Sequence, residues 1–90
     1  VSEYHSNYES GNGYPDITFK AERNTKAVII EIKATSNEED MDELATNALS
    51  QIEEKNYAQP FIKQSKITEI YAYGLVFCKK DCLVFCKKLK

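Results

Sequence analysis

Alternation of hydrophobic and polar positions in the first third of the chain predicts three short strands. Residues 2–10 form a polar, tyrosine-containing segment that we interpret as the first strand. Residues 11–13 follow as Gly-Asn-Gly, and Asn-Gly is a strong hairpin signal because both positions tolerate positive φ. Residues 14–20 alternate as expected for a second strand. After a polar turn over 21–26, the Val- and Ile-rich residues 27–34 predict the third strand.

The middle of the chain has the period of an amphipathic helix over residues 36–56. Ser36 and Glu39 fit a capping box at its start. Pro60 is well placed to begin a second, short helical turn. Residues 66–78 alternate weakly and predict a long fourth strand. The apolar stripe of the main helix follows the i, i+3, i+4 spacing and comprises Met41, Leu44, Ala45, Ala48, Leu49 and Ile52.

The end of the chain contains the segment Leu-Val-Phe-Cys-Lys-Lys twice, at residues 75–80 and 83–88. Two such segments flanking Asp81 and Cys82 predict a terminal hairpin. The order strand, strand, strand, helix, strand, strand indicates an α/β fold of the α+β type with a mixed sheet. We expect a three-strand antiparallel meander, a right-handed crossover through the helix to a parallel fourth strand, and a fifth strand from the hairpin. The helix stripe covers one face, and we expect the carboxylates on the other.

Acidic side chains line up when the simplest hairpin registers are counted. If Lys20 pairs with Ala27 across the polar turn, Asp16 faces Glu31. Lys33 lies two residues beyond Glu31 and therefore points to the same face. Like charges opposite one another destabilise a sheet unless something compensates them, and a cation is the natural compensation.

A third carboxylate joins this group if the Asn-Gly turn has two residues. Gly11 then pairs with Tyr14, and Glu9 faces Asp16. Pro15 cannot donate a ladder hydrogen bond, so we expect the strand pairing to be disturbed beside Asp16.

Composition bounds the possibilities. The 90 residues form one domain, residues 1–90, and because the chain begins with Val1 we interpret it as a fragment of a longer protein. No apolar run approaches the ~20 residues of a membrane span. A net charge of −2 provides no overall attraction to nucleic acid, although lysines cluster near the C-terminus. The three cysteines lack a CxxC pair and are an odd number, which favours reduced thiols and a cytoplasmic protein.

The pattern as a whole resembles the PD-(D/E)XK nuclease superfamily, whose fold is restriction-endonuclease-like. Pro15-Asp16 on one strand and Glu31-Ile32-Lys33 on the next carry the resemblance. The closer resemblance is to the bacterial nuclease-like domain found C-terminal to AAA-type ATPase-like regions. The similar segments span most of the chain and are residues 9–16, 28–33, 48–57 and 73–77.

The resemblance implies a role for each matching residue. Asp16 and Glu31 would be metal ligands, with the Ile32 carbonyl as a third and Glu9 as an additional one. Lys33 would orient the attacking water and stabilise charge at the phosphate. Gln51 and Tyr57 match a helix motif that some members use near the substrate, although their spacing of six does not place them on one helix face. The superfamily's preceding helix has no counterpart in these residues.

Three functions follow from this reading. The first is a Mg²⁺-dependent endo- or exodeoxyribonuclease, in which Mn²⁺ can substitute, acting on DNA through Asp16, Glu31 and Lys33. The second is an inactive nuclease-fold module that binds or regulates and serves an N-terminal ATPase-like region of the same parent chain. The third is an α/β interaction domain without metal, for which Asp16→Ala would be neutral or stabilising. The sequence leaves the oligomeric state open.

Overall fold

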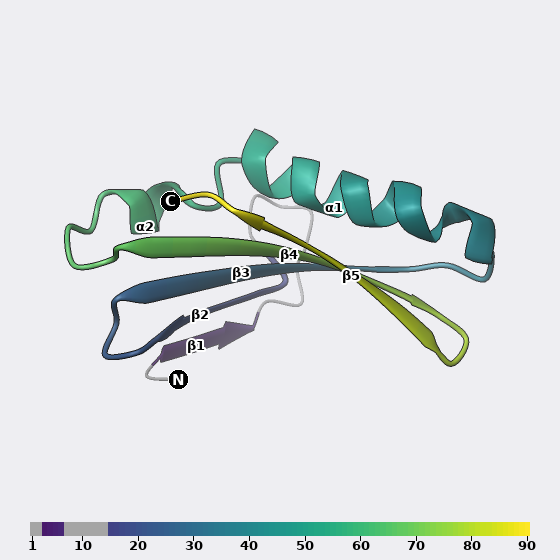
Figure 1. The fold of residues 1–90 in the computed structure, drawn as a ribbon, viewed down its shortest axis with the longest axis horizontal. Coiled ribbons are helices and arrows are strands. Elements are labelled where there is room, and N and C mark those ends of the chain that lie inside the picture. The colour runs from purple at the N-terminus through teal and green to yellow at the C-terminus, as the bar shows by residue number, and fades with distance from the viewer. Residues whose placement is uncertain (1–2, 7–14) are drawn as a thin grey trace.

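A computed structural model describes residues 3–6, of which only the backbone is described, and residues 15–90. Its strands form one mixed sheet in the order β1-β2-β3-β4-β5, with helix α1 lying along one face (Figure 1). The strands are β1 (Glu3–Ser6), β2 (Ile17–Ala21), β3 (Lys26–Ala34), β4 (Glu69–Cys78) and β5 (Asp81–Lys88). The helical elements are η1 (Glu38–Asp40), α1 (Met41–Glu54) and α2 (Gln59–Ile62).

The predicted parallel pairing of β3 with β4, which the helical segment connects, is confirmed. These two strands are parallel, whereas β1 with β2, β2 with β3 and β4 with β5 are antiparallel. Lys20 faces Ala27, as counted from the sequence. The turn between them closes through three residues with positive φ, namely Glu22, Arg23 and Asn24.

The predicted register of the first strand is wrong. A two-residue turn that pairs Gly11 with Tyr14 would place Ser6 opposite Phe19, but Ser6 faces Ile17. Glu9, which that register placed opposite Asp16, lies outside the described residues.

Helix α1 begins later than the sequence pattern indicated. The capping side chain is Asn37 rather than Ser36, and it accepts a hydrogen bond of 3.3 Å from the backbone N–H of Glu39. A single 3-10 turn precedes the α-helix. The predicted stripe is confirmed, because Met41, Ala45, Ala48 and Ile52 are buried. No helix among the described residues is both long enough and apolar enough to cross a membrane.

The face that α1 covers is the one that carries Glu31, which corrects the expectation that the carboxylates lie on the opposite face. Ala27 and Ile29 of β3 pack with Ile52 of α1 in one core cluster. Since side chains alternate along a strand, Glu31 points to the same side, and it is 2% exposed. Val28, Ile30 and Ile32 therefore point to the open face.

The open face keeps apolar side chains partly in contact with solvent. Ile32 is 36% exposed, Phe77 is 44% exposed and Val84 is 50% exposed. These residues come from β3, β4 and β5, and no helix among the described residues packs over them.

The two copies of the repeated segment lie side by side in β4 and β5, but their side chains point in opposite directions. Leu75 faces Val84 across the ladder, and Val76 faces Leu83. Val76 is buried against α1, whereas the corresponding Val84 is on the open face. The hairpin turn is Lys79-Lys80, since Cys78 pairs with Asp81, so the turn is not at Asp81-Cys82 as expected.

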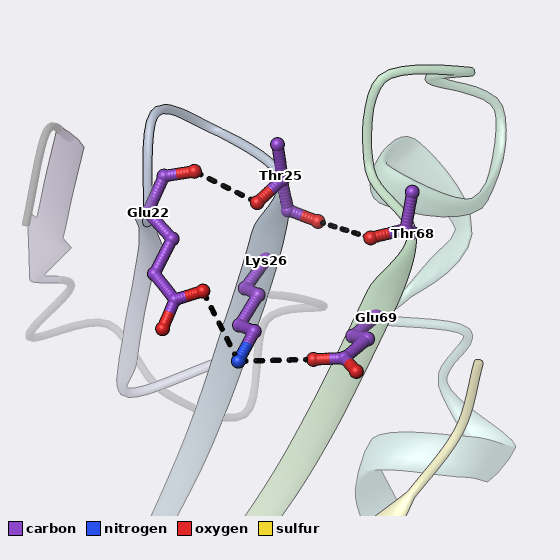
Figure 2. A network of polar contacts seen from close by, with 5 residues as sticks. All are labelled: Glu22, Thr25, Lys26, Thr68 and Glu69. Carbon is purple, nitrogen blue, oxygen red and sulfur yellow. Dashed lines mark hydrogen bonds and ion pairs between the residues drawn. The ribbon is translucent and has the colours of Figure 1, made fainter.

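A polar network joins the β2–β3 turn to the start of β4 (Figure 2). The Lys26 ammonium lies 3.2 Å from a carboxylate oxygen of Glu22 and 3.1 Å from one of Glu69. The Thr68 hydroxyl donates to the carbonyl of Thr25 at 3.3 Å. Lys26 lowers the pKa of Glu69, and Glu69 followed by Glu22 raises the pKa of Lys26. The ion-paired groups are partly or fully exposed, so the network fixes geometry more than it adds stability.

Candidate metal and catalytic site

Asp16 lies just outside β2, where the regular ladder with β3 stops. The strand begins at Ile17, which pairs with Ile30, and Pro15 has no N–H to extend it. The Asp16 carboxylate continues the pairing instead: its Oδ2 accepts the backbone N–H of Ile32 at 2.7 Å. This bond holds the aspartate beside β3. The regular strand pairing is disturbed beside Pro15, as predicted.

Glu31 is the buried member of the acidic pair. The backbone N–H of Asp16 donates to Glu31 Oε1 at 3.3 Å, which brings the two residues together as the counted register predicted. Burial raises the pKa of Glu31, and the neighbouring charge of Asp16 raises it further. The hydrogen bond from Asp16 and the charge of Lys33 oppose this increase. The ionised form of Glu31 is therefore disfavoured unless further positive charge compensates it.

Lys33 lies two residues after Glu31 in β3, on the same face of the sheet. Its ammonium group contacts helix α1. Its Nζ donates to Gln51 Oε1 at 2.7 Å, and Glu31 Oε2 is 4.0 Å away. The Lys33 side chain is 29% exposed, whereas that of Glu31 is 2% exposed. The Lys33 side chain thus lies at the partly exposed rim of the site.

The acidic pair has the chemistry of a divalent-cation site. When both carboxyl groups are ionised, Asp16 and Glu31 carry more negative charge than the one ammonium of Lys33 balances, and a cation would compensate it. Hard cations such as Mg²⁺ prefer oxygen ligands and keep several waters, so a full protein cage is not required. Asp16, Glu31 and the Ile32 carbonyl would supply those oxygens. Among the residues that the structure describes, no group of three or more His, Cys, Asp and Glu side chains forms a metal cluster.

The two residues expected near the substrate have different positions. Gln51 reaches the site through its contact with Lys33. Tyr57 is 4% exposed and packs in the core cluster with Ala27 and Ile52. Its hydroxyl is buried and has no hydrogen-bond partner among the described residues. The spacing of six between the two residues already indicated different faces.

Gly74 is a contributor that the sequence reasoning did not identify. It faces Glu31 across the parallel β3–β4 ladder, and a Cβ there would lie 2.7 Å from the backbone oxygen of Ala45 and 3.0 Å from the Cβ of Ala48. Only glycine lets α1 approach this closely, so Gly74 sets the distance between Gln51 and the sheet. A glycine inside a predicted strand was the available signal, since it often marks close approach of another backbone.

One comparison with known proteins agrees with this geometry. The family model of the PD-(D/E)XK nuclease superfamily matches residues 2–86. Neither the curated proteins nor the solved structures give a match. The mixed sheet with its crossover helix is consistent with a restriction-endonuclease-like fold, and members of the superfamily generally use divalent metals. Over nearly its whole length, this chain therefore belongs to the PD-(D/E)XK nuclease superfamily.

Proposed function

We propose that the chain is a metal-dependent nuclease domain that hydrolyses phosphodiester bonds of DNA in the cytoplasm, with Mg²⁺ as its metal and Mn²⁺ as a substitute. The observation that carries the proposal is the grouping of Asp16, Glu31 and Lys33 at one point of the sheet. Family membership supports nuclease chemistry for this group. An N-terminal ATPase-like region of the same parent chain is proposed as its partner.

Each residue has a separate task in this proposal. Asp16 and Glu31, with the Ile32 carbonyl and Glu9, would hold the metal. When bound, the metal would lower the pKa of a coordinated water and neutralise charge on the phosphate. Lys33 would donate a hydrogen bond to a phosphate oxygen or to the attacking water, because its ammonium is compact and lies at the rim.

Gln51 acts on the substrate through Lys33. Its side-chain oxygen accepts from the Lys33 ammonium at 2.7 Å, which restricts the flexible lysine chain before the substrate arrives. Positioning a charged donor in advance is an effective way to stabilise developing charge. Tyr57 was also expected to bind the substrate, and its buried position instead favours a role in packing α1.

The test is cleavage of supercoiled plasmid and single-stranded DNA with Mg²⁺ or Mn²⁺, comparing wild type with Lys33→Ala. Lys66→Ala is the matched control, because Lys66 is an exposed lysine that precedes β4. We expect wild type and the control to cleave only with metal and Lys33→Ala to lose cleavage. DNA binding without cleavage by the folded protein would favour the inactive module instead. Equal cleavage by wild type and Lys33→Ala would contradict the assigned site.

A further inference from the structure

Strand β5 forms an edge of the sheet and has a free side. Among residues 3–6 and 15–90, only β4 pairs with it. An edge strand presents unpaired N–H and C=O groups that can pair with another strand. Cys82 and Cys86 of β5 are exposed, and Val84 between them is 50% exposed.

The sequence of this edge is complementary to itself when reversed about Val84. If two copies of β5 run antiparallel with Val84 on the two-fold axis, Val84 faces Val84 of the second copy. Leu83 then faces Phe85, Cys82 faces Cys86, and Asp81 faces Lys87. A two-fold interface requires that one patch fit itself in this way. Cross-strand apolar and opposite-charge pairs are the contacts that stabilise such a ladder.

The charges at the two ends of β5 favour the same arrangement. Asp81 borders a shallow hollow of about 410 Å³ that Glu38 and Asp42 also line, and the exposed turn residues Lys79 and Lys80 lie beside it. Lys87 and Lys88 make the other end basic. Antiparallel pairing brings Lys87 of each copy to Asp81 of the other.

The ladder would end at these charged pairs. The next residues in the same register, Lys80 and Lys88, would oppose one another, and Lys80 belongs to the hairpin turn rather than the strand. Lys87 also pairs with Glu53 of α1 within its own chain. The ladder would therefore span Asp81 to Lys87 and no further.

We propose that two copies of this chain associate through β5, antiparallel and centred on Val84, so that one sheet runs through both. The interface is separate from the Asp16–Glu31 site and does not depend on the proposed nuclease activity. Its occupant is a second copy because the edge carries its own complement in both apolar contacts and charge.

The positions of Cys82 and Cys86 allow the proposed register to be tested by disulfide formation. Cys82 and Cys86 of one chain are separated by about 13 Å along the strand, beyond the ~7 Å over which a disulfide can form. Across the proposed pair their Cα atoms would be about 4.5–5.5 Å apart. The third cysteine, Cys78, is buried. Diamide would convert one thiol from each copy to a disulfide, taking up the two protons and two electrons as it becomes the hydrazine.

The experiment compares Cys82→Ser, Cys86→Ser and their equimolar mixture after diamide treatment. Neither variant alone has both cysteines, so we expect no disulfide dimer from either and a linked dimer from the mixture. Peptide mapping should find Cys82 joined to Cys86. A Cys82–Cys82 or Cys86–Cys86 link in the single variants, or no link in the mixture, would overturn the register.

Association without oxidation is tested by light scattering of the reduced protein. Val84→Lys places two ammonium groups together on the axis, so we expect it to be monomeric where wild type is dimeric. Phe77→Lys is the control, because Phe77 is also on the open face but belongs to β4, one strand inside the edge. A monomeric wild type, or a dimer that Phe77→Lys breaks and Val84→Lys does not, would refute edge pairing.

Discussion

The Asp16 carboxylate accepts the backbone N–H of Ile32 at 2.7 Å, so the side chain of a site residue takes the place of a ladder hydrogen bond. The aspartate is thereby tied to the strand that carries Glu31 and Lys33. The bond also separates the contribution of Asp16 to stability from its contribution to metal binding, because an amide oxygen can accept the same N–H without carrying charge.

Asp16→Ala should destabilise the protein, whereas Asp16→Asn should be neutral or stabilising. Alanine removes the acceptor for Ile32, a hydrogen bond to a charged group worth about 1.5–3 kcal/mol. Asparagine keeps an acceptor and relieves the repulsion with Glu31. Urea unfolding without metal measures both. The interaction-domain hypothesis expects Asp16→Ala to be neutral or stabilising, so that result would favour it and would contradict the stabilising role of this hydrogen bond.

Glu31→Gln should change how stability depends on pH. The pKa of Glu31 in the folded protein is raised above 4.5, by burial first and then by Asp16, so the folded state binds this proton more tightly than the unfolded state. Its stabilising contribution is complete below about pH 4.5 and is lost as the pH rises through the raised pKa. Unfolding midpoints across this range should fall more for wild type than for Glu31→Gln.

Divalent metal should reverse that loss in wild type alone. A ligand that binds only the folded state raises stability with its concentration. We expect Mg²⁺ or Mn²⁺ at neutral pH to raise the melting temperature of wild type and not that of Glu31→Gln. An equal increase in both proteins would place the metal elsewhere.

Gln51→Leu should lower kcat while KM changes little, because it removes the acceptor that holds Lys33. Lys33→Ala should lower kcat further, by about 10²–10³ as for other donors to developing charge. If Gln51 acts only through Lys33, adding Gln51→Leu to Lys33→Ala should cause no further loss. Additive losses in this double-mutant cycle would give Gln51 an independent contact with the substrate.

Tyr57→Phe distinguishes packing from substrate binding. The Tyr57 hydroxyl is buried and unpaired among the described residues, and such a group costs about 1–3 kcal/mol. Removing it should therefore raise the free energy of unfolding and leave cleavage unchanged. A large fall in DNA cleavage by a stable Tyr57→Phe protein would restore the substrate-binding role.

Gly74→Ala should loosen the contact between α1 and the sheet. The added Cβ would meet the Ala45 backbone oxygen at 2.7 Å, and overpacking of this kind costs about 1–3 kcal/mol. Chemical denaturation measures the loss. Adding Ala48→Gly should restore little, because the closest atom belongs to the backbone. Full recovery in the double variant would show that the Ala48 methyl, rather than the carbonyl, limits the approach.

The sequence was sufficient for the strand order and for the meeting of Asp16 with Glu31. The turn length fixes the pairing of Lys20 with Ala27, and that pairing carries through to the site. The face of the sheet that α1 covers could not be predicted from the sequence of β3, because Val28 and Ile30 on one face are as apolar as Ile29 on the other. The face of the sheet on which α1 packs depends on residues distant in the sequence, such as Gly74. Because Gly74 has no Cβ, it leaves room for the helix on the face to which a side chain at this position would point.

The β1 register and the terminal hairpin turn show a second limit. In β1, polar residues give no apolar alternation that would select Ser6 to face Ile17. In the hairpin, Lys79-Lys80 and Asp81-Cys82 are adjacent pairs, and the sequence repeat does not indicate which of them forms the turn. Because the two copies have the same sequence, the sequence alone does not indicate which side chains of each copy face the core.

That duplication provides an internal comparison within one molecule. The backbone amides of Leu75–Lys80 and Leu83–Lys88 have nearly the same neighbouring side chains, so their intrinsic hydrogen-exchange rates are nearly equal. Leu75–Cys78 of the first copy lies in the interior strand β4, and the second copy lies at the edge in β5. A difference in protection between matched amides therefore measures the combined contribution of strand position and side-chain burial to local opening, without a reference peptide or a mutation.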